Sequence, residues 1–183
     1  MPESDEHLML AYAGGDSAAF ETLYSRHKGP LYRYVLRSVK GRGEAEELFQ
    51  DIWMRVVEAA SRYRPQARFT TWLYTVAHNR LVDHWRAKGL AVVSLDDEET
   101  SAPEPAAAPS AEPHRIAEAA ATAQQLERAL AALPLAQREA FLLHYEADLT
   151  TAEIAAATGT NAEAAKSRLR YAINKLREAV GDD

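Results

Sequence analysis

Basic and aromatic residues alternate in the short segment 61–69, in a pattern suited to holding a nucleic-acid strand. These residues are Arg62, Tyr63, Arg64, Arg68 and Phe69. Guanidinium groups bind phosphates, and an unstacked base can lie against an aromatic ring. Because Pro65 interrupts the segment, we predict a surface loop that contacts single-stranded nucleic acid. An ordinary basic surface loop would have a similar composition.

The loop leads into a predicted helix over residues 69–88. Its apolar residues fall on one arc of the helical wheel: Leu73, Val76, Ala77, Leu81 and Trp85. The opposite arc carries an amide, a carboxylate and a guanidinium, at Asn79, Asp83 and Arg86. Thr70 is expected to cap the start of the helix, and Gly89 stands where the helix should end. The polar arc is either a solvated face or a continuation of the nucleic-acid site.

A second candidate site lies near the C-terminus, where two helix starts are separated by a glycine. Thr150 with Glu153, and Thr160 with Glu163, each match a capping box, and Gly159 stands between the two helices. Two capped helices joined by a tight turn predict a helix-turn-helix. The outward face of the second helix is basic, with Lys166, Ser167, Arg168, Arg170 and Lys175. Such a helix can enter the DNA major groove; a small three-helix bundle with a basic face is the alternative.

Composition limits the function classes. The 183 residues have a formal net charge of −6 and contain no cysteine, which excludes disulfides and thiolate metal sites. Residues 17–88 nevertheless carry a net charge of +6, because the acidic residues concentrate in the first 16 residues and in 89–122. The N-terminus lacks the pattern of a signal peptide, and no apolar run is long enough to span a membrane. We expect a soluble, cytoplasmic protein.

The remaining segments predict an all-α fold. Helices are expected over 17–27, after Pro30, and over 44–60, with residues 1–16 as an acidic tail. Residues 89–116, rich in proline, alanine and acidic residues, are expected to form a flexible linker. Further helices follow over 117–132, with Leu126 and Leu130 inward, and from Pro134 to about Tyr145. We therefore predict two small helical domains, 1–88 and 117–183, joined by the linker 89–116.

The predicted helix 44–60 has more apolar surface than one core face requires. Ala45, Leu48, Ile52, Val56 and Ala59 recur at intervals of three and four. A second line contains Phe49 and Trp53, beside Gln50, Asp51 and Arg55. Either a neighbouring helix or a partner protein would explain this second line.

Taken together, these motifs resemble those of extracytoplasmic-function sigma factors, the smallest type of the sigma-70 family. The marks in the first domain are Gly15–Phe20, Ala45–Asp51 and Trp72-Leu73 with Asn79, Asp83 and Arg86. Those in the second are Leu133-Pro134, Glu153–Ala155 and Lys166–Leu169. Their order and spacing on both sides of a linker make the resemblance specific.

The resemblance implies the role of each site. The helix 44–60 is expected to dock on the β′ clamp helices of core RNA polymerase through Leu48, Phe49, Gln50, Asp51, Trp53 and Arg55. The minus-ten promoter element is expected to contact Arg62, Tyr63, Arg64, Arg68, Phe69, Asn79, Arg80, Asp83 and Arg86. The helix-turn-helix, near the β flap, is expected to read the minus-thirty-five element with Lys166, Ser167, Arg168, Arg170, Tyr171 and Lys175. An anti-sigma factor is a further expected partner, and no metal or cofactor is expected.

One departure and three rival functions stand beside this interpretation. Ala164-Ala165 replaces the threonine and β-branched residue that usually precede Lys-Ser-Arg in the family, which affects minus-thirty-five reading. An adaptor that binds anti-sigma factors without touching DNA is the main alternative. An ordinary helix-turn-helix repressor would leave 44–88 unexplained. An enzyme is least favoured, because His78 and His84 lack metal-ligand spacing on their helix.

Overall fold

The computed structural model describes residues 3–90 and 115–181, and every regular element in these ranges is helical. The N-terminal half contains α1 (Asp5–Ala13), α2 (Ser17–Ser38), α3 (Arg42–Ala59), the 3-10 turn η1 (Ala60–Arg62) and α4 (Phe69–Ala87). The C-terminal half contains α5 (Arg115–Ala132), α6 (Leu135–Tyr145), α7 (Thr151–Thr158) and α8 (Ala162–Val180). The expected all-α fold is confirmed. Most of the predicted linker, residues 91–114, lies outside the described residues.

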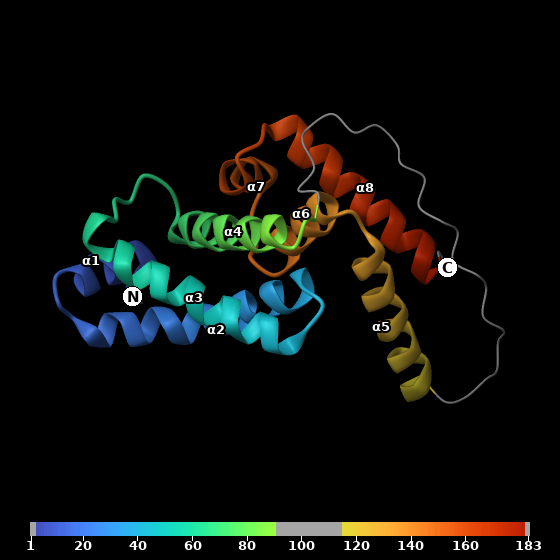
Figure 1. The fold of residues 1–183 in the computed structure, drawn as a ribbon, viewed down its shortest axis with the longest axis horizontal. Coiled ribbons are helices and arrows are strands. Elements are labelled where there is room, and N and C mark those ends of the chain that lie inside the picture. The colour runs from blue at the N-terminus through green and yellow to red at the C-terminus, as the bar shows by residue number, and fades with distance from the viewer. Residues whose placement is uncertain (1–2, 91–114, 182–183) are drawn as a thin grey trace.

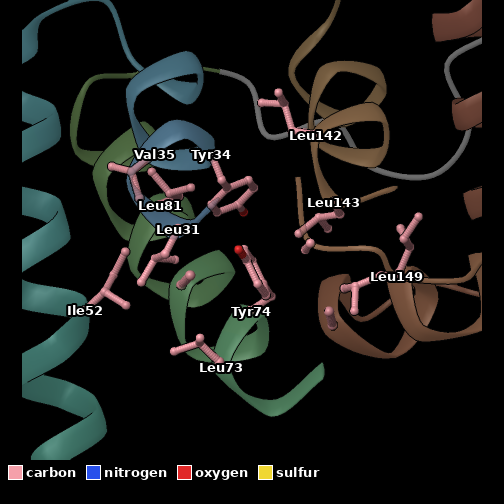
Figure 2. Packing of buried hydrophobic residues seen from close by; sticks show 14 of the residues in the cluster. Leu31, Tyr34, Val35, Ile52, Leu73, Tyr74, Leu81, Leu142, Leu143 and Leu149 are labelled. Atoms are coloured by element: carbon pink, nitrogen blue, oxygen red, sulfur yellow. The ribbon is translucent and has the colours of Figure 1, made fainter. Parts of the chain in front are cut away.

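The two halves pack against one another around a continuous apolar core (Figure 1). α7 packs against α4, and α6 contacts α2. Figure 2 shows Tyr34 of α2 and Tyr74 of α4 facing the leucines of the C-terminal half, among them Leu143 and Leu149. The two tyrosine rings meet edge to face, with their centroids 5.3 Å apart. Burial raises the pKa of both tyrosines, so their hydroxyl groups stay protonated.

The acidic N-terminus is a folded helix, and the prediction of a tail was wrong. Ser4 caps α1 by accepting from the backbone N–H of His7, and Leu8 and Met9 are buried. The acidic side chains bind the rest of the half: Asp5 pairs with Arg26 and His27. The basic block 17–88 is therefore partly neutralised by the chain's own first helix.

α2 runs through Pro30 without a break, where the sequence predicted two helices. Proline removes one backbone donor and costs roughly 3 kcal/mol inside a helix. Leu23, Leu31 and Val35 lie on one buried stripe that extends across the proline. Because both segments bury the same face, core packing offsets the local cost.

The predicted cap of α7 is confirmed, whereas the predicted cap of α8 is not. Thr150 and Glu153 form the predicted capping box of α7, and Gly159 ends that helix in the left-handed conformation at φ 67°. α8 is capped by Asn161 instead of Thr160, because the Asn161 side chain accepts from Ala164 N. Leu126, predicted to face inward, is exposed, whereas Leu130 is buried as expected.

α4 begins at Phe69, one residue before the predicted cap Thr70. The residue at the cap position, Arg68, makes no side-chain cap. The acceptor comes from α1, since the Glu6 carboxylate accepts from the Phe69 backbone N–H at 2.7 Å. A contact between distant segments therefore replaces the local cap.

This contact gives a first testable expectation. Glu6→Ala is expected to lower the free energy of unfolding by about 1 kcal/mol, as for the loss of an ordinary helix cap. Glu6→Gln should lose less, because the amide oxygen can still accept. Urea denaturation of the full chain measures both variants; equal stability of Glu6→Ala and the native chain would show that α1 does not cap α4.

Candidate nucleic-acid interface

The second helix of the helix-turn-helix presents a basic outer face. Ala165, Leu169, Ala172 and Leu176 are buried in the core, so the intervening positions are turned outward. Of the predicted reading residues, Lys166, Arg170, Tyr171 and Lys175 are exposed, while Ser167 and Arg168 are partly buried. The Arg170 guanidinium lies 5.5 Å from the centre of the Tyr171 ring, a cation–π distance.

A groove of about 310 Å³ runs between the start of α7 and the outer face of α8. Its polar lining combines two predicted residues, Lys166 and Arg170, with Thr151, Asn174 and Arg177. Thr151, Asn174 and Arg177 were not among the residues predicted from the sequence. Steps of four and seven residues from Arg170 reach Asn174 and Arg177, so the helical period could have found both. A row of donors from Lys166 to Arg177, about three turns long, is thus available to a nucleic-acid backbone or base edge.

The loop before α4 places its charges outside and its rings inside. Arg62, Arg64 and Arg68 are exposed. Tyr63 is 2% exposed and Phe69 is fully buried, so neither ring forms the wall of an open base pocket in this arrangement, in contrast to the prediction. Trp72 of α4 is half-buried and lies 4.9 Å from Tyr63, ring centre to ring centre. In this arrangement Trp72 is the member of the aromatic cluster that a base could reach.

Burial also sets the ionisation of Tyr63. Burial is the largest cause that raises the pKa of the hydroxyl to about 12, and the charges of the nearby Glu6 and Asp5 carboxylates contribute to the same shift. The ring is therefore a neutral core residue at physiological pH. Its position beneath Trp72 supports that tryptophan.

The polar arc of α4 is tied to α3 by two ion pairs. Arg80 binds Asp51 through Nε and Nη2, at 3.0 and 2.8 Å, and Arg55 binds Asp83 at 3.1 Å. Both pairs join a residue predicted to contact polymerase to one predicted to contact the minus-ten element. Asn79 and Arg86 are exposed beside them. The two predicted sites therefore lie on one continuous surface.

The predicted polymerase-docking residues of α3 divide into core and surface. Leu48 and Trp53 are buried, at 1% and 6% exposure, so their side chains stabilise the N-terminal half in this arrangement. Phe49 is partly buried and packs edge to face on Tyr32. Gln50 is exposed, and Met54, which was not among the predicted contacts, is 58% exposed one turn further along. An apolar side chain this exposed is a candidate partner contact.

Glu153 links the two candidate sites. It accepts from Thr150 in the capping box and also binds Arg68 at 3.2 Å. Burial alone would raise its pKa, but the hydrogen bonds from Thr150 and the charge of Arg68 outweigh burial and lower it below 4.5.

This lowered pKa predicts an acid-sensitive contribution to stability. A carboxyl group with a depressed folded-state pKa stabilises the fold above its unfolded pKa, and this contribution is lost as the pH falls through the folded value. The stability advantage of the native chain over Glu153→Gln should therefore be full at neutral pH and should shrink below pH 4.5. Urea titrations of both chains over this range test it. An advantage that does not change with pH would rule out ionised Glu153 as its source.

Within residues 3–90 and 115–181 no cluster of three or more histidine or acidic side chains could hold a metal ion. No helix in the same ranges is long and apolar enough to cross a membrane.

Taken together, the fold and its exposed cations define an all-helical DNA-binding protein with a helix-turn-helix at its C-terminal end. The model for sigma-70 region 2 matches residues 23–90, and that for sigma-70 region 4 matches residues 123–176. The RNA polymerase sigma factor CarQ of Myxococcus xanthus is 30% identical over 174 residues, covering 95% of this chain and 96% of the relative. The ECF RNA polymerase sigma factor RpoE of Cereibacter sphaeroides is 32% identical over 169 residues, covering 89% and 87%.

Two solved structures share the fold. CnrH, determined in complex with the cytosolic domain of CnrY, has a TM-score of 0.69 at 20% identity and covers 96% of each chain. The sigma factor RpoE of Bartonella quintana, in complex with the anti-sigma factor NepR, has a TM-score of 0.65 at 22% identity, covering 88% of this chain and 96% of that one. The chain belongs to the extracytoplasmic-function sigma factors of the sigma-70 family, and it functions in promoter-specific transcription initiation.

Proposed function

We propose that this sigma factor uses three surfaces in turn. The exposed part of α3, around Gln50 and Met54, docks on the β′ clamp helices of core RNA polymerase. The loop before α4, with Arg62, Arg64 and Arg68, binds the minus-ten element together with the polar arc of α4. A base of this element stacks on the Trp72 ring. The groove between α7 and α8 reads the minus-thirty-five element, with the C-terminal half placed near the β flap.

The observation that carries this proposal is the row of donors along α8. Lys166, Arg170 and Arg177 line one groove with Asn174, whereas the helix buries its opposite face. Cations aligned along a recognition helix bind phosphates and base edges. An adaptor that never touches DNA has no use for such a row, so we favour the sigma factor over that alternative.

The protein is proposed to act without catalysis of its own, in the cytoplasm, where core polymerase and promoter DNA are found. It is proposed to be held inactive by an anti-sigma factor. Support comes from the two structural neighbours, which were solved with the cytosolic domain of CnrY and with the anti-sigma factor NepR. Since those likenesses are of fold alone, the identity of the partner has to come from experiment.

Run-off transcription tests the function as a whole. Purified core polymerase is incubated with a pooled promoter library, with and without the full chain. New discrete start sites that require the chain are expected, and their upstream sequences give both promoter elements. If no start depends on the chain, although it is folded and binds core polymerase, the adaptor becomes the better interpretation.

The docking surface has its own test. Gln50→Ala with Met54→Ala is expected to weaken binding to core polymerase by about 1–2 kcal/mol, the usual cost of truncating central interface residues. Both side chains are exposed, so the stability of the free chain should hardly change. Leu126→Ala, exposed on α5, is the control. Binding is measured by fluorescence anisotropy with labelled chain; an unchanged affinity would move the docking site away from this part of α3.

A further inference from the structure

Three glutamates spaced seven residues apart in the C-terminal half each bind side chains of the N-terminal half. They are Glu139 in α6, Glu146 at the end of α6 and Glu153 in α7. Their partners come from α2, from α4 and from the residue before α4. We call these three residues the glutamate latch.

Glu139 is the buried member of the latch. Its side chain is 6% exposed, and Oε1 accepts from the Tyr34 hydroxyl at 2.7 Å. The same oxygen lies 2.7 Å from His78 Nδ1. A carboxylate is costly to bury unless it is hydrogen-bonded, and both partners belong to the other half. Glu139 is therefore satisfied only while the two halves are together.

Glu146 binds two arginines of α2. Its two carboxylate oxygens take one guanidinium each, Arg33 at 2.7 Å and Arg37 through Nη1. Its side chain is only 11% exposed. The two arginines are more exposed, at 50% and 38%, so only the carboxylate side of these pairs is shielded from solvent. Glu146 thus fixes the end of α6 against α2.

Glu153 engages the candidate DNA site itself. It binds Arg68, the last arginine of the loop predicted to contact the minus-ten strand, and it lies 3.4 Å from the hydroxyl of Thr71 on α4. A carboxylate at Arg68 occupies the position where a DNA phosphate would bind. Because α7 packs against α4, it also limits the approach of a strand from that side (Figure 1).

We propose that the glutamate latch holds the free sigma factor in a closed, inhibited arrangement, in which the C-terminal half competes with the minus-ten strand for the N-terminal half. The proposal rests on the proposed function, since it requires Arg68 and α4 to bind DNA. Opening releases Arg68, Thr71 and His78 together. The C-terminal half is then free to reach the minus-thirty-five element at a distance from the minus-ten element.

The mixed character of the interface fits a reversible contact. Apolar packing by Tyr34, Tyr74 and Leu143 supplies attraction, but every latch residue is a carboxylate that water or another cation could satisfy after opening. Interfaces between parts of one chain that move apart are generally more polar than permanent ones. A fully apolar contact would favour permanent closure.

Distance measurements test the latch in the full chain. The native sequence has no cysteine, so spin labels can be attached to Glu21→Cys on α2 and Ala162→Cys at the start of α8, both exposed positions. Electron paramagnetic resonance then gives the distribution of distances between the halves. The native latch should give one narrow distribution, and Glu139→Gln with Glu146→Gln and Glu153→Gln should give a broader and longer one. Glu47→Gln with Glu58→Gln and Glu127→Gln, all exposed, changes the charge equally and should resemble the native chain.

DNA binding is measured on the same variants without labels. The probe is a fluorescent single-stranded oligonucleotide taken from a promoter found by the run-off assay. The latch variant should bind it at least ten times more tightly than the native chain, whereas the control variant should not. A native distribution already as broad as that of the latch variant overturns the proposal. An open latch variant with unchanged oligonucleotide affinity overturns it as well.

A second pair of variants covers the case in which the triple variant fails to fold. Glu146→Arg should open the chain by repelling Arg33 and Arg37, and adding Arg33→Glu with Arg37→Glu should close it again. Absence of this rescue contradicts the latch. If the native chain supports no run-off transcription, that result would count against the proposed function alone. The distance measurement requires no promoter and still tests the latch.

Discussion

Replacing Phe69 by alanine is expected to lower the free energy of unfolding by about 3–5 kcal/mol, as for other fully buried aromatic residues. The ring has no exposed surface and its centre lies within 6.2 Å of those of Tyr63, Trp72 and His27. Removing it leaves a cavity at the point where α1, the loop and α4 meet. Urea denaturation of the full chain measures the loss. Phe69→Leu, which keeps most of the volume, should cost much less.

This experiment separates two roles for the aromatic cluster. If Phe69 is a core residue, Phe69→Leu should leave minus-ten strand affinity close to native. Trp72→Ala should instead weaken strand binding by about 1–3 kcal/mol, the usual value of one base stacked on an aromatic ring. The opposite result, a stable Phe69→Leu chain with lost binding, would show that the ring turns outward to hold a base.

Local sequence signals predicted the individual helices well. The capping box at Thr150 and the buried line Ala165, Leu169, Ala172 and Leu176 both follow from spacing within one helix. These features depend on residues three or four positions apart, so the helical period alone identifies them. The resemblance to sigma factors then assigned each segment a role.

Contacts between distant segments could not be predicted in the same way. The start of α4 depends on Glu6, and the continuity of α2 through Pro30 depends on a core formed by other helices. Aromatic residues beside arginines predicted a base pocket. The residue types alone do not show which of these rings is buried in the core. α1 packs against η1 and its Glu6 side chain accepts from the Phe69 backbone N–H; in this arrangement Tyr63 and Phe69 are buried, while Trp72 remains reachable.

The candidate surfaces were incomplete for a related reason. Met54 was overlooked because a methionine in an apolar helix is usually a core residue, and only the packing of α3 shows that it faces out. The glutamate latch was invisible because its partners lie 61 to 113 residues away in the chain. The residues that flank these glutamates in the sequence are typical of a helix, and they do not indicate a partner in a distant segment.

Arg170→Ala is expected to weaken binding to the minus-thirty-five duplex by about 1–3 kcal/mol and to relax the preference at one base pair. Arg170 is exposed, lines the groove beside Lys166, and is oriented by its contact with the Tyr171 ring. A guanidinium in this position can donate two hydrogen bonds to a guanine edge. The helix itself should be unaffected, since the side chain lies outside the core.

Arg177→Ala provides the matched comparison, because it removes the same group from the same groove two turns further along α8. At this distance from the start of the recognition helix we expect a phosphate contact, which weakens all sequences equally and lowers the salt dependence of binding by about one charge. Anisotropy titrations at several salt concentrations, with the duplex found by run-off transcription and a scrambled one, distinguish the two. If Arg170→Ala also weakens both duplexes equally, base reading must come from other residues of the groove, with Asn174 as the next to test.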